Sequence, residues 1–342
     1  MAYWHVDKHV DHLNEHEAIE EAAALLQQNE IVAFPTETVY GLGGNACSDE
    51  AVSKIFNAKG RPADNPLIVH IYSFAQLDDV AASVPSAAQQ LMKAFWPGPL
   101  TIILPAGNKI SKKATAGLDT VGVRMPNHPV ALALIEKANL PIAAPSANRS
   151  GKPSPTAASH VIADLEHHIA GVIDGGKTGL GVESTVVQAI EDDVVILRPG
   201  GITREQLESA VGKERVKTSR SDGEAPRSPG MKYAHYAPRA PLYLVYGDVK
   251  RVRNELLSEQ AKGRRVGILT TSEHINAYAD AECVIACGKR SDLPSVAKQL
   301  YAVLRQFDAQ GVDVIISESF PKEGIGEAIM NRLEKAAAKT IG

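Results

Sequence analysis

In the first part of the chain, short apolar runs alternate with stretches in which apolar positions recur with helical spacing. The runs have the length of single strands and lie at Ile31–Phe34, Leu67–Ile71, Leu100–Leu104, Val121–Met125, Ile142–Ala144 and Val172–Asp174. Helical patterns lie between them at Glu15–Gln28, Asp49–Ala58, Ala87–Phe95, Pro129–Ala138 and Thr156–Ile169. We expect Asn14 and Glu17 to cap the first helix, and a hairpin at Ser184–Leu197. Crossover helices together with a hairpin predict a mixed sheet covered by helices.

A second pattern of strands and helices follows a stretch without apolar periodicity. Residues 213–240 are rich in Ser, Arg, Gly and Pro, so we expect a linker there. Beyond it, predicted strands at Leu242–Tyr246, Arg265–Thr270, Cys283–Ala286 and Val312–Ser317 alternate with predicted helices at Val249–Ala261, Leu293–Gln310 and Glu327–Lys339. This order is typical of a small, Rossmann-like parallel sheet. The prediction is a first domain at 1–212, a linker at 213–240 and a second domain at 241–342.

The composition is that of an ordinary globular protein. Hydrophobic residues make up 44% and charged residues 22% of the 342 positions, which excludes disordered and fibrous proteins. No apolar run approaches the ~18 residues of a membrane span, and the N-terminus lacks the regions of a signal peptide. We therefore expect a cytoplasmic protein with no membrane partner. Three cysteines, Cys47, Cys283 and Cys287, are too few for a disulfide framework and are expected to be inert thiols.

Charge is distributed unevenly along the chain. Residues 1–212 carry 15 Lys and Arg against 24 Asp and Glu, a net −9, whereas the predicted linker carries 7 against 3, a net +4. Within the acidic first part, residues 50–124 reverse the sign, with 8 cations against 5 anions. We therefore expect positive potential to be concentrated at one cleft, which suits a small anionic ligand better than a long polyanion.

Two patterns suggest other sites but fail in context. Residues 171–178 fit the P-loop pattern G-x-x-x-x-G-K-[ST], yet the predicted strand lies inside the match and Gly179-Leu180-Gly181 follows where a P-loop would open a helix. Four histidines at helical spacing suggest a metal-binding face: His5, His9, His12 and His16. The predicted helix begins only near Glu15, and no cysteine or carboxylate pattern completes a metal site, so we expect no protein-bound metal.

Turn formers, hydroxyls and cations are concentrated in two neighbouring stretches. They read Pro35-Thr36-Glu37-Thr38-Val39-Tyr40-Gly41-Leu42-Gly43 and Lys59-Gly60-Arg61-Pro62-Ala63-Asp64-Asn65-Pro66-Leu67. One glycine separates Lys59 from Arg61, which offers an ammonium and a planar guanidinium to an anion. Two prolines fix the chain around Asn65, whose amide both donates and accepts hydrogen bonds. A phosphate-handling site would need these groups, although the two cations could also be solvated surface charges.

Other polar residues end predicted strands. His70 follows apolar residues and is expected at a sheet edge where ligands bind, with a core histidine as the alternative. Ser146 and Asn148 also follow a strand, where they could simply form a turn. No Ser-His-Asp order, metal triad or pair of carboxylates on one helix is evident. The chemistry would then come from positioning and charge neutralisation, which suits attack on phosphorus with pyrophosphate as the leaving group.

The two stretches together resemble the YrdC/TsaC-like threonylcarbamoyl-AMP synthases, and the second strand and helix pattern resembles their long, two-domain form. Further matches follow in the family's order: Pro66-Leu67-Ile68-Val69-His70, Trp96-Pro97-Gly98-Pro99-Leu100-Thr101, Val121-Gly122-Val123-Arg124-Met125-Pro126, Ala144-Pro145-Ser146-Ala147-Asn148, Glu183-Ser184-Thr185-Val186-Val187 and Arg198-Pro199-Gly200. The resemblance implies a YrdC-like mixed, twisted sheet with helices, joined by a linker to a smaller Rossmann-like α/β domain.

The resemblance also implies an activity and a set of site residues. The activity is synthesis of L-threonylcarbamoyl-AMP and pyrophosphate from L-threonine, bicarbonate or CO2, and ATP, for threonylcarbamoyladenosine in tRNA. The residues implied for the reacting nucleotide pocket are Lys59, Arg61, Ser146 and Asn148. Those implied for L-threonine are Thr38, His70, Arg124, Ala144 and Ser184. Those implied for ATP, besides the first set, are Asn65, Thr120, Ser154, Arg198 and Tyr236.

Cofactors and partners follow from the same resemblance. Mg2+ would enter with ATP through the phosphate oxygens. Proteins that transfer the threonylcarbamoyl group to tRNA would act downstream, with at most a weak contact to tRNA itself. The basic linker, including Tyr236, is expected to act as a lid over the bound nucleotide, with a passive tether as the alternative.

Two other functions remain open at this stage. One is a related enzyme that adenylates carbamate for hydrogenase maturation, and the absence of C-x-x-C zinc motifs speaks against it. The other is an RNA-binding module that uses the positive cleft. Overall acidity and an aromatic content of 5% weigh against that module, because binding of single strands relies on exposed rings.

Overall fold

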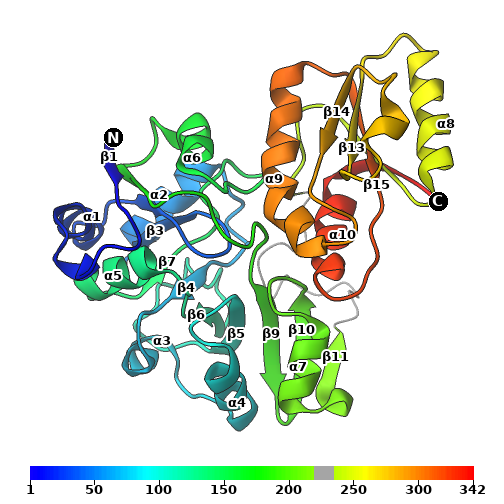
Figure 1. Cartoon of the computed structure of the whole chain (residues 1–342). Helices are drawn as coiled ribbons and strands as arrows, with labels where there is room; N and C mark the ends of the chain where they lie inside the picture. Colours follow the sequence, from blue (N-terminus) through cyan, green and yellow to red (C-terminus); the bar gives the residue numbers. More distant parts are fainter. Residues whose placement is uncertain (219–234) are drawn as a thin grey trace. The chain divides into compact units, whose positions relative to one another are not determined.

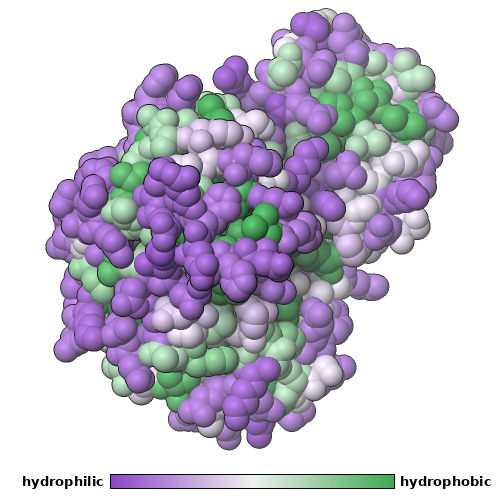
Figure 2. Space-filling view, turned by 60° about the vertical axis from the view of Figure 1, so that its left-hand side comes forward, coloured by the Kyte–Doolittle hydropathy of each residue, from purple (hydrophilic) through white to green (hydrophobic). Residues whose placement is uncertain are grey.

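The computed structural model describes residues 1–218 and 235–342, and the chain divides into two compact units (Figure 1). Among the described residues, the first unit comprises 1–150, 155–179 and 183–218, and the second comprises 151–154, 180–182 and 235–342. No helix in these described ranges is long and apolar enough to cross a membrane. On the face shown in Figure 2, hydrophobic residues lie in small patches among hydrophilic ones.

An eleven-stranded sheet runs through the first unit in the order β1-β8-β2-β3-β7-β4-β6-β5-β9-β10-β11. Its strands are β1 Ala2–His5, β2 Val32–Phe34, β3 Gly41–Asn45, β4 Ile68–His70, β5 Leu100–Pro105, β6 Thr120–Arg124, β7 Ile142–Ala143, β8 Gly171–Asp174, β9 Thr185–Ile190, β10 Asp193–Arg198 and β11 Val216–Thr218. Strands β4 and β6 pair in parallel, whereas β9 and β10 form an antiparallel hairpin. The predicted mixed sheet and hairpin are therefore confirmed.

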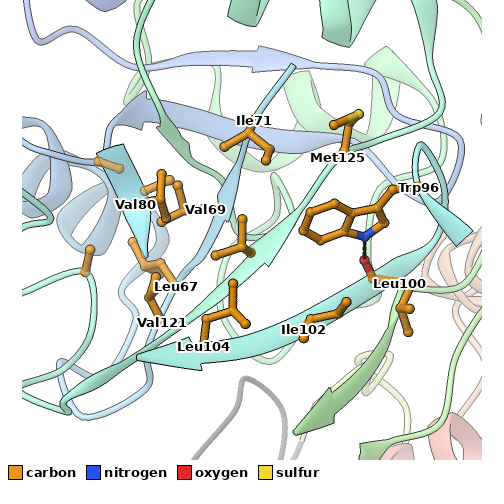
Figure 3. Packing of buried hydrophobic residues seen from close by; sticks show 14 of the residues in the cluster. Leu67, Val69, Ile71, Val80, Trp96, Leu100, Ile102, Leu104, Val121 and Met125 are labelled. Carbon is orange, nitrogen blue, oxygen red and sulfur yellow. Dashed lines mark hydrogen bonds between the residues drawn. The ribbon is translucent and has the colours of Figure 1, made fainter. Parts of the chain in front are cut away.

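Helices accompany this sheet at the predicted places, with additional short ones. They are α1 Glu17–Gln27, α2 Asp49–Lys59, α3 Leu77–Val80, α4 Ser86–Phe95, α5 Pro129–Ala138, α6 Ala158–Leu165 and α7 Arg204–Val211, with 3-10 turns η1 Leu13–Glu15, η2 Phe74–Gln76 and η3 Lys213–Arg215. Apolar side chains from β4, β5 and β6 form a continuous buried cluster (Figure 3). Trp96 joins this cluster and donates from Nε1 to Leu100 O at 2.7 Å, which satisfies the indole N–H inside the core.

Two local features of the first unit differ from the prediction. Helix α1 is capped by His16, whose Nδ1 accepts from Ala18 N, and not by Asn14 and Glu17, because residues 13–15 form η1. Strand β3 was not predicted, since its glycines look like turn formers. A Cβ at Gly43 would lie 2.7 Å from the Phe34 ring, so glycine is required there for close packing of the strand.

The second unit contains a five-stranded sheet in the order β14-β13-β15-β12-β16. Its elements are β12 Leu242–Val245, α8 Val249–Gln260, β13 Val266–Thr270, η4 Ile275–Tyr278, β14 Cys283–Ala286, α9 Leu293–Gln310, β15 Val314–Glu318, α10 Ile325–Ala336 and β16 Ala337–Ile341. Every pairing is parallel, which confirms the predicted Rossmann-like sheet. The helix predicted to reach Lys339 ends at Ala336, because the following residues pair with β12 instead.

The predicted linker contains regular structure at its start. Residues 213–218 form η3 and β11, and β11 pairs in parallel with β10. Most of the remainder, residues 219–234, lies outside the described residues, and with it most of the predicted lid.

The P-loop match at 171–178 is excluded as predicted, since β8 occupies its first half and β9 is the next element.

Candidate active site

Strands β4 and β6 lie side by side and carry predicted site residues at both ends. Their parallel register places His70 opposite Arg124, so these two residues end their strands at the same edge. Thr120 begins β6, and Asn65 lies shortly before β4, at the other end of the pair. Since a strand rises about 3.3 Å per residue, the two ends of β6 are about 13 Å apart. Of these four residues, the two implied for threonine therefore lie at one end of the strand pair and the two implied for the nucleotide lie at the other.

Arg124 provides the positive charge at the end of the strand pair where His70 lies. Its side chain is buried, with Nη1 donating to Thr38 Oγ1 at 3.0 Å and Nε donating to Gly98 O at 3.3 Å. Its Nη2 lies 2.6 Å from Glu37 Oε2, but among the described residues neither this nitrogen nor the Glu37 carboxylate makes a hydrogen bond. The guanidinium is therefore fixed in place, and a carboxylate that replaced Glu37 would meet the donors of Nη2.

His70 is a neutral group beside this cation. Burial, with a smaller contribution from the Arg124 charge, lowers the pKa of His70 from its usual 6.5 to about 3. Phe34 contacts the ring edge to face, at 6.4 Å between centroids. Nδ1 has no hydrogen-bond partner in the described part of the chain. His70 can therefore hydrogen-bond a ligand at neutral pH, but it cannot serve as an effective base or as a cation.

Ser184 is held by neighbours from two strands. Its Oγ lies 2.8 Å from Thr101 Oγ1 on β5. At the end of β10, Arg198 donates to the Ser184 carbonyl from Nε and Nη2, at 3.2 and 3.0 Å, and from Nη2 to Oγ at 3.2 Å. Arg198 therefore orients Ser184, and its binding to the nucleotide stays a prediction.

Lys59 connects the end of α2 to the loop after β7. The ammonium is buried and donates to the carbonyl oxygens of Ser146 and Asn148, at 2.5 and 2.6 Å. Burial lowers its pKa well below the usual value, with Arg61 adding a second, smaller cause. In the same loop, Ser146 Oγ donates to Asn148 Oδ1 at 2.6 Å. Lys59 thus positions the loop through two of its backbone carbonyl groups.

The same loop begins at Ala144, whose N–H donates to Ile68 O at 2.9 Å and ties it to β4. Arg61 bends back over its own segment and donates to the carbonyl oxygens of Asn65 and Pro66, at 3.1 and 2.9 Å. Asn65 is buried, yet neither its amide nitrogen nor its amide oxygen has a hydrogen-bond partner among the described residues. A buried, unpaired amide is costly, so Asn65 is well suited to bind a polar ligand.

Two predicted residues belong to the second unit. Ser154 is fully buried within the segment 151–154. Tyr236 is buried between the rings of His235 and Tyr301, at 5.5 and 5.3 Å between centroids, with Arg332 5.7 Å from its ring centroid. Its backbone is left-handed, at φ 68°. These contacts show that the Tyr236 side chain is well packed. Its binding to a nucleotide stays a prediction.

Sequence reasoning missed two residues that shape this site, Glu37 and Thr101. Both lie inside stretches that were singled out for the resemblance, but neither was assigned a role. The alternation of Thr36, Glu37 and Thr38 offered a signal, since a carboxylate between two buried hydroxyls needs a cation nearby. Thr101 offered none, because a threonine in an apolar strand is common.

Comparisons with known proteins cover nearly the whole chain and not only the residues of the site. Residues 24–200 match the Sua5, YciO and YrdC family model, described as telomere recombination, and residues 202–338 match one described as the C-terminal domain of threonylcarbamoyl-AMP synthase. The chain is 56% identical to a threonylcarbamoyl-AMP synthase of Bacillus subtilis, over 99% of this chain and 98% of that protein. It is 46% identical to the same-named protein of Pyrococcus abyssi, over 96% and 98%. A crystal structure of P. abyssi Sua5 complexed with L-threonine superposes with a TM-score of 0.92 at 44% identity, covering 100% of this chain and 99% of that one.

Proposed function

Because the chain belongs to the threonylcarbamoyl-AMP synthase family, we propose that it forms L-threonylcarbamoyl-AMP and pyrophosphate from L-threonine, bicarbonate or CO2, and ATP. The observation that carries this proposal is the buried Arg124 guanidinium, fixed by Thr38 and Gly98 and close to a neutral histidine. Such a group suits an amino-acid carboxylate, since a planar fork matches two oxygens.

The threonine would lie at the ends of β4 and β6. Its carboxylate would pair with Arg124, taking over contacts that Glu37 approaches in the free protein. His70 Nδ1 and the Ser184 hydroxyl would hydrogen-bond the remaining polar groups, with the backbone of Ala144 nearby. A neutral His70 supports this arrangement, because a second cation beside Arg124 would be poorly solvated.

The nucleotide would be held at the other end of the strand pair. The unpaired amide of Asn65 supports this placement, as do Thr120 and the Ser146–Asn148 loop that Lys59 orients. Arg61 would supply positive charge near the phosphates. Arg198 would act through Ser184, and Ser154 and Tyr236 remain proposed ligands of ATP.

The reaction needs positioning and charge more than a protein nucleophile. The threonine amine would attack the carbon of CO2 and lose a proton, which gives a carbamate. One carbamate oxygen would then attack the α-phosphorus of ATP, forming the new P–O bond while the bond to pyrophosphate breaks. Fixed cations would stabilise the charge that develops on the phosphate oxygens.

We propose that Mg2+ comes with ATP. In the described ranges, no group of three or more His, Cys, Asp or Glu side chains is arranged to hold a metal ion. The site instead offers hydroxyls, amides and cations, a set that suits an ion carried by phosphate oxygens and water. Mg2+ would supply charge neutralisation at the triphosphate. Downstream transfer proteins, a weak contact with tRNA and a cytoplasmic location remain predictions.

The decisive assay measures pyrophosphate release from ATP while threonine and bicarbonate are omitted in turn. We expect release to require both, and mass spectrometry to detect threonylcarbamoyl-AMP in the complete mixture. Pyrophosphate release that continues unchanged without threonine would contradict the proposed function.

A further inference from the structure

A cavity of about 250 Å³ lies in the first unit. One of its lining residues is Glu37, which forms the ion pair with Arg124. It brings together four segments that are distant in sequence: the stretch after β1, the stretch after β2, the loop before α5 and the stretch after β8. The side chains that matter are those of Lys8, His9, Glu37, Asn127, His128 and Lys177. Two of these segments come from the histidine pattern and the P-loop match, which the proposed function leaves without a role.

The charge of this cavity is positive. Lys8, His9 and Lys177 are exposed, and none of them forms an ion pair with any residue in the described ranges. Glu37 is the one carboxylate among the lining residues, and it is already paired with Arg124 at 2.6 Å. The neighbouring Asp174 accepts hydrogen bonds from Tyr3 and from Gly176 N, at 2.5 and 2.9 Å. Among the described residues, neither Lys8 nor Lys177 is therefore paired with a carboxylate.

The N-terminus of α5 reaches the same cavity. His128 is its N-cap and Pro129 its first residue, and no side chain caps the N–H groups of the first turn. The positive end of the helix dipole therefore lies at the cavity, although Pro129, the α5 residue that lines it, has no N–H to donate. Polar groups nearby are unpaired as well. His128, of which 6% is exposed, has no hydrogen-bond partner at Nδ1, and Thr178 Oγ1, buried next to Lys177, also has none among the described residues.

We propose that this cavity binds a small oxyanion, of the size and charge of bicarbonate or inorganic phosphate. Lys8 and Lys177 supply the charge, the positive end of the α5 dipole adds to it, and His128 supplies a neutral hydrogen-bonding nitrogen. Burial keeps His128 neutral, since it lowers the pKa to about 4. The position next to the Glu37–Arg124 pair favours bicarbonate, the anion that the reaction consumes, and this choice of anion rests on the proposed function.

The test is an NMR titration of the full-length protein with isotope-labelled histidine, at constant ionic strength. Bicarbonate, phosphate and chloride are added separately, and the His128 resonance is identified by its loss in His128→Asn. We expect bicarbonate to shift the His128 signal with saturation at millimolar concentration. The double variant Lys8→Gln, Lys177→Gln should weaken this binding at least fivefold, while the matched control Lys93→Gln, an exposed lysine of α4, should leave it unchanged.

The possible results test the anion site and the proposed reaction separately. A higher bicarbonate KM for pyrophosphate release in the double variant, at unchanged threonine KM, supports a substrate subsite. Saturable shifts with phosphate alone support the oxyanion site and overturn its assignment to bicarbonate. Shifts that chloride reproduces, that the double variant retains in full, or that are absent overturn the site. If binding is found but pyrophosphate release does not depend on threonine, the site stands and the proposed function fails.

Discussion

At the residue scale, the site depends on a few buried polar side chains whose hydrogen-bonding capacity is only partly used. His70 and Asn65 each have at least one polar atom without a hydrogen bond among the described residues, whereas Arg124 Nη2 and Glu37 Oε2 meet as an ion pair at 2.6 Å. Buried polar groups are usually paired, and each unpaired group raises the free energy of the folded state. A ligand that supplies the missing partners regains this energy on binding, so these atoms mark where substrates are expected.

Replacing Arg124 with Lys keeps the charge but removes the fork. We expect threonine binding to weaken by about 1.5–3 kcal/mol, roughly 10- to 150-fold in Kd, because hydrogen bonds to a charged group are lost. ATP binding should change little. Isothermal titration with each ligand separately measures both, and Arg204→Lys on α7 is the control. An equal loss of affinity for threonine and for ATP would show that Arg124 supports the fold and does not bind threonine directly.

Burial of His70 makes stability depend on pH. Its pKa is about 3 in the folded protein and 6.5 in an unfolded chain, so between these values the unfolded chain binds more protons. The free energy of unfolding should therefore fall as pH drops below 6.5, with a slope approaching about 1.4 kcal/mol per pH unit from this group. His128, at about 4, acts in the same direction.

Urea unfolding at a series of pH values between 7 and 5 tests this expectation. His70→Gln should reduce the slope by up to about 1.4 kcal/mol per pH unit, since one buried titrating group is removed. The exposed His167, changed to Gln, should leave the slope unchanged. Identical slopes in the wild type and His70→Gln would contradict the assignment of His70 as a buried, neutral side chain.

At the element scale, the site is assembled where strands end. Pairing of β4 with β6 brings His70 to Arg124, and pairing of β5 with β9 brings Thr101 to Ser184. Apolar runs predicted most of these strands, because the runs correspond to buried positions. Strand β16 was missed for a physical reason. Its Ala and Lys residues favour a helix when taken alone, and parallel pairing with β12 overrides that preference.

The Thr101–Ser184 contact predicts coupling between β5 and β9. Ser184→Ala leaves the Thr101 hydroxyl buried without this partner, which should cost about 1–3 kcal/mol of unfolding free energy. Adding Thr101→Val removes the unpaired hydroxyl, so the double variant should be more stable than the sum of the single losses predicts. Urea unfolding of all four proteins gives the coupling energy. Strictly additive losses would show that the two hydroxyls do not interact.

At the scale of the whole molecule, the sequence was sufficient for the fold class and the family, and it was less complete for the site. The parallel second sheet and the mixed first sheet follow from hydrophobic patterning, and the ordered motifs identify the family. Side-chain roles depend on long-range contacts that spacing does not encode. Lys59, which was expected at the nucleotide, holds two backbone carbonyls far along the chain, and Glu37 pairs with an arginine at the end of β6.

The division into units has a consequence for how the protein is made. Residues 151–154 and 180–182 belong to the second unit, although most of that unit begins after residue 234. Gly151 O accepts from Ala237 N, and Arg305 donates to Pro153 O, so these early residues are held by late ones. A ribosome releases the chain from its N-terminus, so both short segments emerge before their partners have been translated. Both segments therefore stay without these partners until the intervening chain has been made, and the second unit can be completed only when β16, the last strand of its sheet, has left the ribosome.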